Sequence, residues 1–325
     1  MIPQNNISQN KNENNFNLDK ISMNQIEPLN IISEEPQFTN ITKKNSIKEE
    51  ILQLTVMSSS TITLGTKLKI DKNGLIEGSL RNKKDNITYF GYMEINNINN
   101  YDESIIVDYI LPQNKYKNED DNEEKYIGRY FQISYNLNLK KYYIRDLGYG
   151  LGTFIKIKEP LLLKDNFLIS IGDSYLVINL ENPDEKDLIL CHNHNYSNNT
   201  FDSKLQGIGK KLRIKLFEKN KDKKGNEYIF SPNINKIIRI GRKKHNNDIE
   251  LEDSLVSKIN CNIQYNPNEG WYIKDGNEII NSNGIIKKKE STNGTWFLAV
   301  EDFEIYNGMI FKGNFNLFYC NIILE

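Results

Sequence analysis

From Thr61 onward the chain is dominated by short runs of alternating or apolar residues, separated by polar turns. A first series of runs lies at 67–70, 88–95, 104–111, 130–135, 142–146, 153–157 and 175–180. A second series lies at 212–217, 228–230, 237–240, 248–251, 262–265, 271–274, 295–298, 309–311 and 315–324. Many short β-prone runs with turn signals between them are typical of an antiparallel sandwich or barrel. We therefore expect an all-β fold.

The polar stretches between these series predict the domain boundaries. At 325 residues the chain has room for about two domains. Residues 1–60 are Asn-rich without sustained periodicity, which predicts a disordered tail, with 46–53 as a possible short helix capped by Ser46. Residues 182–208 are again polar and predict a linker. We expect two sandwiches in tandem, at 62–181 and 209–325.

The two series overlay as an internal repeat. The segment 143–146 (YIRD) aligns with 272–275 (YIKD), and 152–154 (GTF) aligns with 294–296 (GTW). Each series is therefore expected to form the same kind of β unit.

Three motifs of the second series carry donors for an oxyanion. Gly241-Arg242 offers a planar guanidinium fork, and Ser257 offers a hydroxyl. The Thr292-Asn293-Gly294 turn adds amide and backbone donors, at a position where glycine permits a backbone conformation that other residues resist. A phosphorylated side chain carries nearly two negative charges and three acceptor oxygens, so it suits such a cluster.

The order of these motifs resembles the forkhead-associated (FHA) domain, a β-sandwich that binds phosphothreonine peptides. The resemblance covers roughly 209–325, and it implies that Arg242, Ser257, Lys258, Thr292 and Asn293 bind the phosphopeptide. It also implies that Gly241, Asn260 and Gly294 are structural. Asn260 stands where the family has a histidine that braces the loops. Each motif alone has a simpler interpretation, such as a surface arginine, a strand start or a plain hairpin turn.

The resemblance further implies a preference for phosphothreonine over phosphoserine, through a methyl contact, and selectivity a few residues after the phosphothreonine. The segment 277–290 is an inserted loop with a basic end at Lys287, Lys288 and Lys289. It is either a contact for acidic peptides or an ordinary solvated loop.

The first half, roughly 62–181, also resembles an FHA domain but lacks the phosphate chemistry. By the repeat alignment Arg242 corresponds to Tyr92, Ser257 to Ile127 and Asn293 to Leu151. Because desolvating a phosphate against apolar side chains is costly, we expect no phosphopeptide binding there. A rival alignment takes 127–129 (IGR) as the Gly-Arg motif.

Charge and cysteine content limit the partners and the compartment. The chain has 42 Lys and Arg against 43 Asp and Glu, so nothing in its overall charge favours nucleic acid or an anionic membrane. Three irregularly spaced cysteines imply no disulfide framework, and neither a signal sequence nor a membrane-spanning run is apparent. We expect a soluble cytoplasmic or nuclear protein.

No catalytic constellation stands out. With three histidines in total, neither a catalytic triad nor a kinase signature set is present, and no cofactor is expected. Cys191, His192 and His194 are metal-capable, but they lack a second ligand cluster, so we expect no metal.

The expected function is therefore that of a non-catalytic signalling adaptor, which binds a threonine-phosphorylated protein through the second sandwich. The alternative is a structural scaffold protein of a larger assembly, which docks without phosphate. The oligomeric state is left open.

Overall fold

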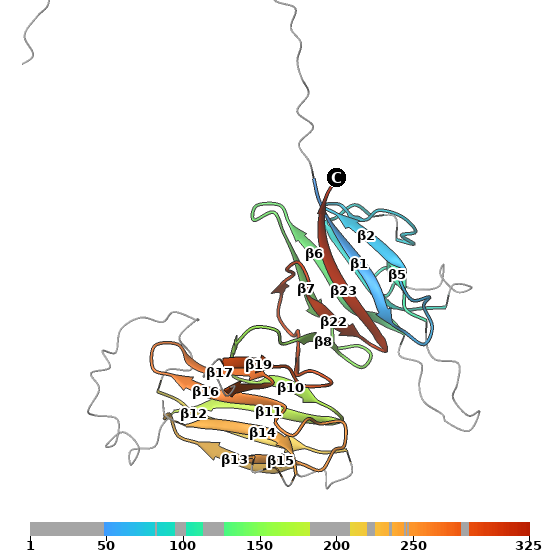
Figure 1. Cartoon of the computed structure of the whole chain (residues 1–325). Coiled ribbons are helices and arrows are strands. Elements are labelled where there is room, and N and C mark those ends of the chain that lie inside the picture. The colour runs from blue at the N-terminus through green and yellow to red at the C-terminus, as the bar shows by residue number, and fades with distance from the viewer. Residues whose placement is uncertain are drawn as a thin grey trace, which may run out of the picture. The chain divides into compact units, whose positions relative to one another are not determined.

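The computed structural model describes residues 49–81, 83–94, 102–112, 127–182, 209–219, 225–233, 236–243, 245, 247–280 and 286–325. All regular structure in these residues is β (Figure 1). The first half contains β1 (Glu50–Ser58), β2 (Lys67–Asp71), β3 (Gly74–Leu75), β4 (Ile87–Tyr92), β5 (Tyr109–Ile110), β6 (Gly128–Asn136), β7 (Lys141–Asp146), β8 (Thr153–Lys156), β9 (Leu161–Leu162), β10 (Phe167–Ile171) and β11 (Ser174–Glu181). The second half contains β12 (Lys211–Phe217), β13 (Asn226–Phe230), β14 (Ile237–Arg242), β15 (Ile249–Leu251), β16 (Cys261–Asn266), β17 (Gly270–Asp275), β18 (Asn277–Ile280), β19 (Ile286–Lys289), β20 (Trp296–Leu298), β21 (Phe303–Glu304), β22 (Ile310–Gly313) and β23 (Asn316–Leu324).

The strands form two sandwiches that share one long sheet. This sheet has 11 strands in the order β13-β12-β11-β10-β20-β8-β22-β23-β1-β2-β3. A five-stranded sheet, β21-β7-β6-β4-β5, packs on its β8-to-β3 end, where Phe131 of β6 contacts Phe311 and Phe318. The second five-stranded sheet, β15-β14-β16-β17-β9, belongs to the other sandwich. The all-β sandwich architecture expected from the sequence is thus confirmed.

The two halves of the chain exchange their last strands. The C-terminal strands β21, β22 and β23 pair with β7, β8 and β1 of the first half. Conversely, β9, β10 and β11 pair with β17, β20 and β12 of the second half. Figure 1 makes this visible, because red β23 lies beside blue β1, while green β10 and β11 lie among orange strands. Neither 62–181 nor 209–325 therefore corresponds to one sandwich.

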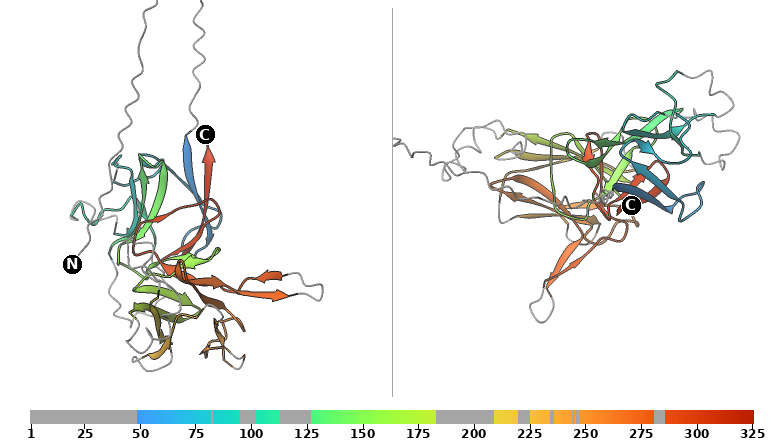
Figure 2. Two further views of the ribbon diagram at one scale, coloured as in Figure 1. Left: turned by 90° about the vertical axis from the view of Figure 1, so that its left-hand side faces the viewer. Right: turned by 90° about the horizontal axis from the view of Figure 1, so that it is seen from above.

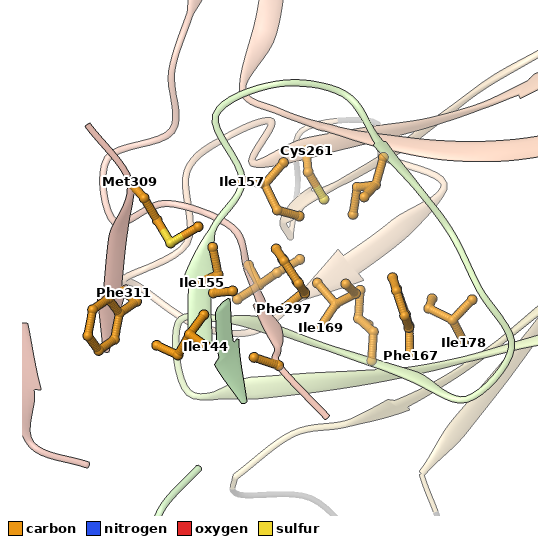
Figure 3. Packing of buried hydrophobic residues seen from close by; sticks show 14 of the residues in the cluster. Ile144, Ile155, Ile157, Phe167, Ile169, Ile178, Cys261, Phe297, Met309 and Phe311 are labelled. Atoms are coloured by element: carbon orange, nitrogen blue, oxygen red, sulfur yellow. The ribbon is translucent and has the colours of Figure 1, made fainter. Parts of the chain in front are cut away.

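The crossing point is the antiparallel pair of β8 and β20. Ile155 and Phe297 are register partners there. The pair is extended by hydrogen bonds from the Ile157 amide to the Thr295 carbonyl and from the Ala299 amide to the Thr153 carbonyl, each 2.9 Å. Figure 3 shows Ile155 and Phe297 between side chains of both sandwiches, within one buried apolar cluster. The core therefore continues through the crossing.

Two expectations about the N-terminal region were wrong. β1 occupies Glu50–Ser58, inside the range assigned to the tail, and residues expected to be helical from Glu50 onward are strand. The reason is burial on alternate positions, since Leu52, Leu54 and Val56 are almost inaccessible. Leu52 and Leu54 pair with both β2 and β23, and Val56 pairs with β23. Residues 1–48, which include the first three residues of the expected helix, lie outside the described residues.

The segment 277–290, expected to be a loop, contains a hairpin of β18 and β19 that projects from the second sandwich (Figure 2). Its three lysines are exposed, and Lys288 donates to the carbonyl of Lys158 at 2.6 Å. In the described part of the chain, no helix has the length and apolar character that a membrane crossing requires.

Candidate functional site

The site begins where β14 ends, at Gly241-Arg242. The backbone of Lys258 passes directly over Gly241, because a Cβ placed there would lie 2.3 Å from the Lys258 carbonyl oxygen. The Arg242 amide donates to the Ser257 carbonyl at 2.9 Å. Glycine at 241 therefore lets the segment with Ser257 approach the arginine.

Ser257 and Thr292 are joined by two hydrogen bonds. The Ser257 hydroxyl accepts from the Thr292 amide at 2.9 Å and donates to the Thr292 hydroxyl at 3.2 Å. Both residues retain contact with solvent. The fold thus brings the hydroxyls of Ser257 and Thr292 together at the end of β14, although 35 residues separate Ser257 from Thr292 along the chain.

The cations of this end of the sandwich differ in their partners. Lys243 pairs with Glu252. Lys258 is exposed, whereas Arg242 is half-buried. Among the described residues, no carboxylate lies within ion-pair distance of the Arg242 guanidinium. The guanidinium carries five N–H donors, which suit the binding of an anion.

Asn293 and Gly294 complete the turn. The Asn293 side-chain amide donates to the Leu255 carbonyl at 2.7 Å, and the Asn293 carbonyl accepts from the indole of Trp296 at 2.8 Å. Gly294 adopts a φ of 80°, in the region that favours glycine. The turn is held on both sides, so Asn293 has a defined orientation.

Asn260 braces these segments from below. Its Oδ1 accepts from the Ser257 amide at 3.2 Å, and its Nδ2 donates to the Thr295 hydroxyl at 3.1 Å. The side chain is 1% exposed. An amide thus makes the loop-bracing contacts that the resemblance assigns to histidine.

Asp275, which the sequence analysis did not single out, organises the same region. This buried carboxylate accepts from the Ser291 amide at 3.1 Å, the Ser291 hydroxyl at 2.6 Å and the Thr295 hydroxyl at 2.6 Å. A buried charge requires such partners. The sequence did contain a signal for Asp275, because the aligned segments 143–146 and 272–275 both end in an aspartate, Asp146 and Asp275.

The cysteine in this region is not poised as a nucleophile. Burial, followed by the charge of Asp275, raises the pKa of the Cys261 thiol. The thiolate is the reactive species, so a fully buried thiol with a raised pKa is inert at neutral pH.

The corresponding end of the first sandwich has the same backbone arrangement with other side chains. A Cβ at Gly91 would lie 2.0 Å from the Gly128 carbonyl oxygen, as at Gly241. Tyr92 and Ile127 are half-buried, and Leu151 is 50% exposed. Ile127 and Leu151 have no polar side-chain group, and Tyr92 has a single hydroxyl where the second sandwich has the guanidinium of Arg242.

The rival alignment of 127–129 with the Gly-Arg motif is wrong. Arg129 lies at the start of β6, opposite Gly91 at the end of β4. Its guanidinium donates to the Ile106 carbonyl at 2.9 Å and stacks 3.8 Å from the Tyr89 ring centroid. The Arg129 guanidinium is therefore engaged in contacts within the first half of the chain.

The metal-capable residues Cys191, His192 and His194 lie outside the described residues. Within the described ranges, no group of three or more His, Cys, Asp or Glu side chains is arranged to hold a metal ion.

The second sandwich thus carries hydrogen-bond donors on the loops at one end, at Arg242, Ser257 and Thr292. Residues 238–311 match the family model of the FHA domain. FHA domains recognise phosphothreonine peptides in protein–protein interactions and are generally non-catalytic. The searches of the curated proteins and of the solved structures gave no match.

The matched range and the sandwich do not coincide. The match begins in β14 and ends at Phe311 in β22. Phe311 packs against Phe131 of the first half, at 5.5 Å between ring centroids. The strands that complete the sandwich of Arg242 are instead β9, β10 and β11.

Proposed function

We propose that this protein is a non-catalytic adaptor that binds a threonine-phosphorylated partner through Arg242, Ser257, Thr292 and Asn293, with Lys258 at the periphery. The observation that carries the proposal is the meeting of the Ser257 and Thr292 hydroxyls, 3.2 Å apart, beside an arginine without a described carboxylate partner. The FHA match over 238–311 supports it.

Each residue has a distinct role in the proposed complex. Arg242 neutralises the phosphate and can contact two of its oxygens. Because Ser257 donates to Thr292, the Thr292 hydroxyl hydrogen is available to the phosphate. Asn293 commits its Nδ2 to Leu255, which leaves its Oδ1 for a peptide N–H. The FHA match favours phosphothreonine over phosphoserine.

The first sandwich takes no part in phosphate recognition under this proposal. Tyr92, Ile127 and Leu151 replace the arginine, the serine and the asparagine, and they offer no charge to a phosphate. Ile127 and Leu151 offer a phosphate no hydrogen-bond donor, and leaving a charge unpaired out of water costs far more than the roughly 2–7 kcal/mol of an uncharged polar group.

A second candidate function is a scaffold that docks without phosphate. It is favoured by apolar side chains at the corresponding end of the first sandwich, where Tyr149 is 57% exposed and Leu151 is 50% exposed. In that case the partner would bind to this end whether or not it is phosphorylated.

Capture from peptide libraries tests the proposal. The full-length chain is immobilised and offered degenerate phosphothreonine, phosphoserine and unphosphorylated libraries. The proposal expects selective capture of phosphothreonine peptides. Equal capture from all three libraries, or none by a folded protein, would contradict it and favour the scaffold.

A further inference from the structure

A turn from the first half of the chain contacts the loop that holds Asn293. The turn joins β10 to β11 at Gly172-Asp173, and it reaches the second sandwich because these strands are exchanged. The Asp173 amide donates to the Asp253 carboxylate at 2.8 Å. A Cβ at Gly172 would lie 2.3 Å from the same oxygen, and Gly172 has a φ of 58°. Only glycine fits this contact without displacing Asp253.

Asp253 transmits this contact to the site. Its second oxygen accepts from the Leu255 amide at 2.8 Å, and its backbone carbonyl accepts from the Val256 amide at 3.2 Å. The carbonyl of Leu255 in turn accepts from the Asn293 side chain at 2.7 Å. A continuous path of hydrogen bonds therefore leads from the first-half turn to a residue of the proposed phosphopeptide site.

We propose that Gly172 and Asp253 are positioning residues for phosphopeptide binding, so that the site of the second sandwich depends on strands of the first half. This inference rests on the proposed function of Asn293. Neither residue contacts the peptide. They fix the Leu255 carbonyl, which orients the Asn293 amide before binding and so reduces the ordering that binding would require.

The chain offers a matched control for Gly172. Asn314 lies in the turn between β22 and β23, the exchanged counterpart in the other sandwich, and has a φ of 55°. Alanine at either position has the same disfavoured backbone conformation, although only Gly172→Ala adds a Cβ. Only the Gly172 turn lies against Asp253 and the proposed site.

The test uses calorimetric titration of the full-length protein with a phosphothreonine peptide selected from the library. Gly172→Ala and Asp253→Ala should each weaken binding roughly ten-fold, the low end of what one hydrogen bond involving a charged group contributes. The double variant should also lose roughly ten-fold, because both changes break the same path, and additive losses are expected only of independent sites. Asn314→Ala should bind like the wild type.

A second readout does not require a ligand. Hydrogen exchange of the Leu255 amide should accelerate in Gly172→Ala and Asp253→Ala and stay unchanged in Asn314→Ala. Thermal unfolding identifies variants that fail to fold, and Asp253→Asn, which keeps the side-chain size, then replaces Asp253→Ala.

The outcomes separate the two proposals. Unchanged affinity in Gly172→Ala, or multiplied losses in the double variant, would overturn the positioning role while leaving phosphopeptide binding intact. If the wild type binds no phosphopeptide, the proposed function fails and the positioning role fails with it. Accelerated exchange at Leu255 would then support the hydrogen-bond path alone.

Discussion

Ile155 and Phe297 face each other in register at the centre of the β8–β20 pair. Each of the two strands has a second neighbour on its other edge. Ile155 of β8 also pairs with Phe311 of β22, and Phe297 of β20 also pairs with Ile169 of β10. These residues repeat along the chain at one constant spacing. Phe297 follows Ile155 by 142 residues, and Phe311 follows Ile169 by 142 residues. The two halves therefore cross at an internal two-fold relation, and each half completes the sandwich of the other.

Engineered disulfides should report this exchange directly. Val177 of β11 and Lys215 of β12 are register partners, at a spacing compatible with a disulfide. In a Cys191→Ser background, Val177→Cys with Lys215→Cys should cross-link on oxidation. Val177→Cys with Thr55→Cys should not, because Thr55 pairs with Tyr319. Peptide mapping under non-reducing conditions distinguishes the two, and the reverse pattern would show that β11 returns to β1.

Alanine at Gly241 and at Gly91 should separate stability from binding. Each methyl group would meet a backbone carbonyl, at 2.3 and 2.0 Å, so each variant should lose about 1–3 kcal/mol of unfolding free energy. Only Gly241→Ala should also weaken phosphopeptide binding, since Gly91 lies in the other sandwich. Urea unfolding and calorimetric titration measure both quantities. Equal affinities for the two variants would place the peptide elsewhere.

Asn260→Ala should destabilise the fold and loosen the site. Its loss leaves the Ser257 amide without its side-chain partner, at a cost of about 1–3 kcal/mol. Affinity for the phosphopeptide should fall with it. Asn262→Ala is the control, because Asn262 is buried and donates to the Gly276 carbonyl at 2.8 Å, outside the proposed phosphopeptide site. That variant should lose stability while keeping affinity; a matching loss of affinity would refute the bracing role.

The strands were predictable from sequence because their alternation is strong, and β16, β17 and β20 lie where the pattern places them. The exchange of strands between the two halves could not be predicted, because 157–181 and 299–324 carry equivalent patterns of alternating apolar residues. Such alternation does not specify which sandwich a strand joins. Likewise, the order of the motifs indicated that Ser257 and Thr292 lie close together. The contact of Asp253 with the Asp173 amide could not be predicted, because it depends on the exchanged β10–β11 turn.

The two buried thiols should make stability fall at alkaline pH. Burial raises the pKa of Cys261 and of Cys320. Their stabilising contribution is complete below the unfolded thiol pKa, about 8.5, and it is lost as pH rises toward the folded values, because only the unfolded chain releases the protons. The slope should approach about 1.4 kcal/mol per pH unit for each thiol.

Urea unfolding between pH 8 and 9.5 measures this slope. Replacing both cysteines by alanine should flatten it, even though the variant is less stable overall. An unchanged slope in the double variant would assign the pH dependence to other groups.

Calorimetric titration of Arg242→Ala with a phosphothreonine peptide tests most directly whether Arg242 binds the phosphate. We expect a loss of about 2–5 kcal/mol of binding free energy, because the phosphate would stay partly desolvated without its partner. Arg239→Ala, on the same strand and exposed, should bind like the wild type. Undiminished binding by a folded Arg242→Ala protein would contradict the proposed site.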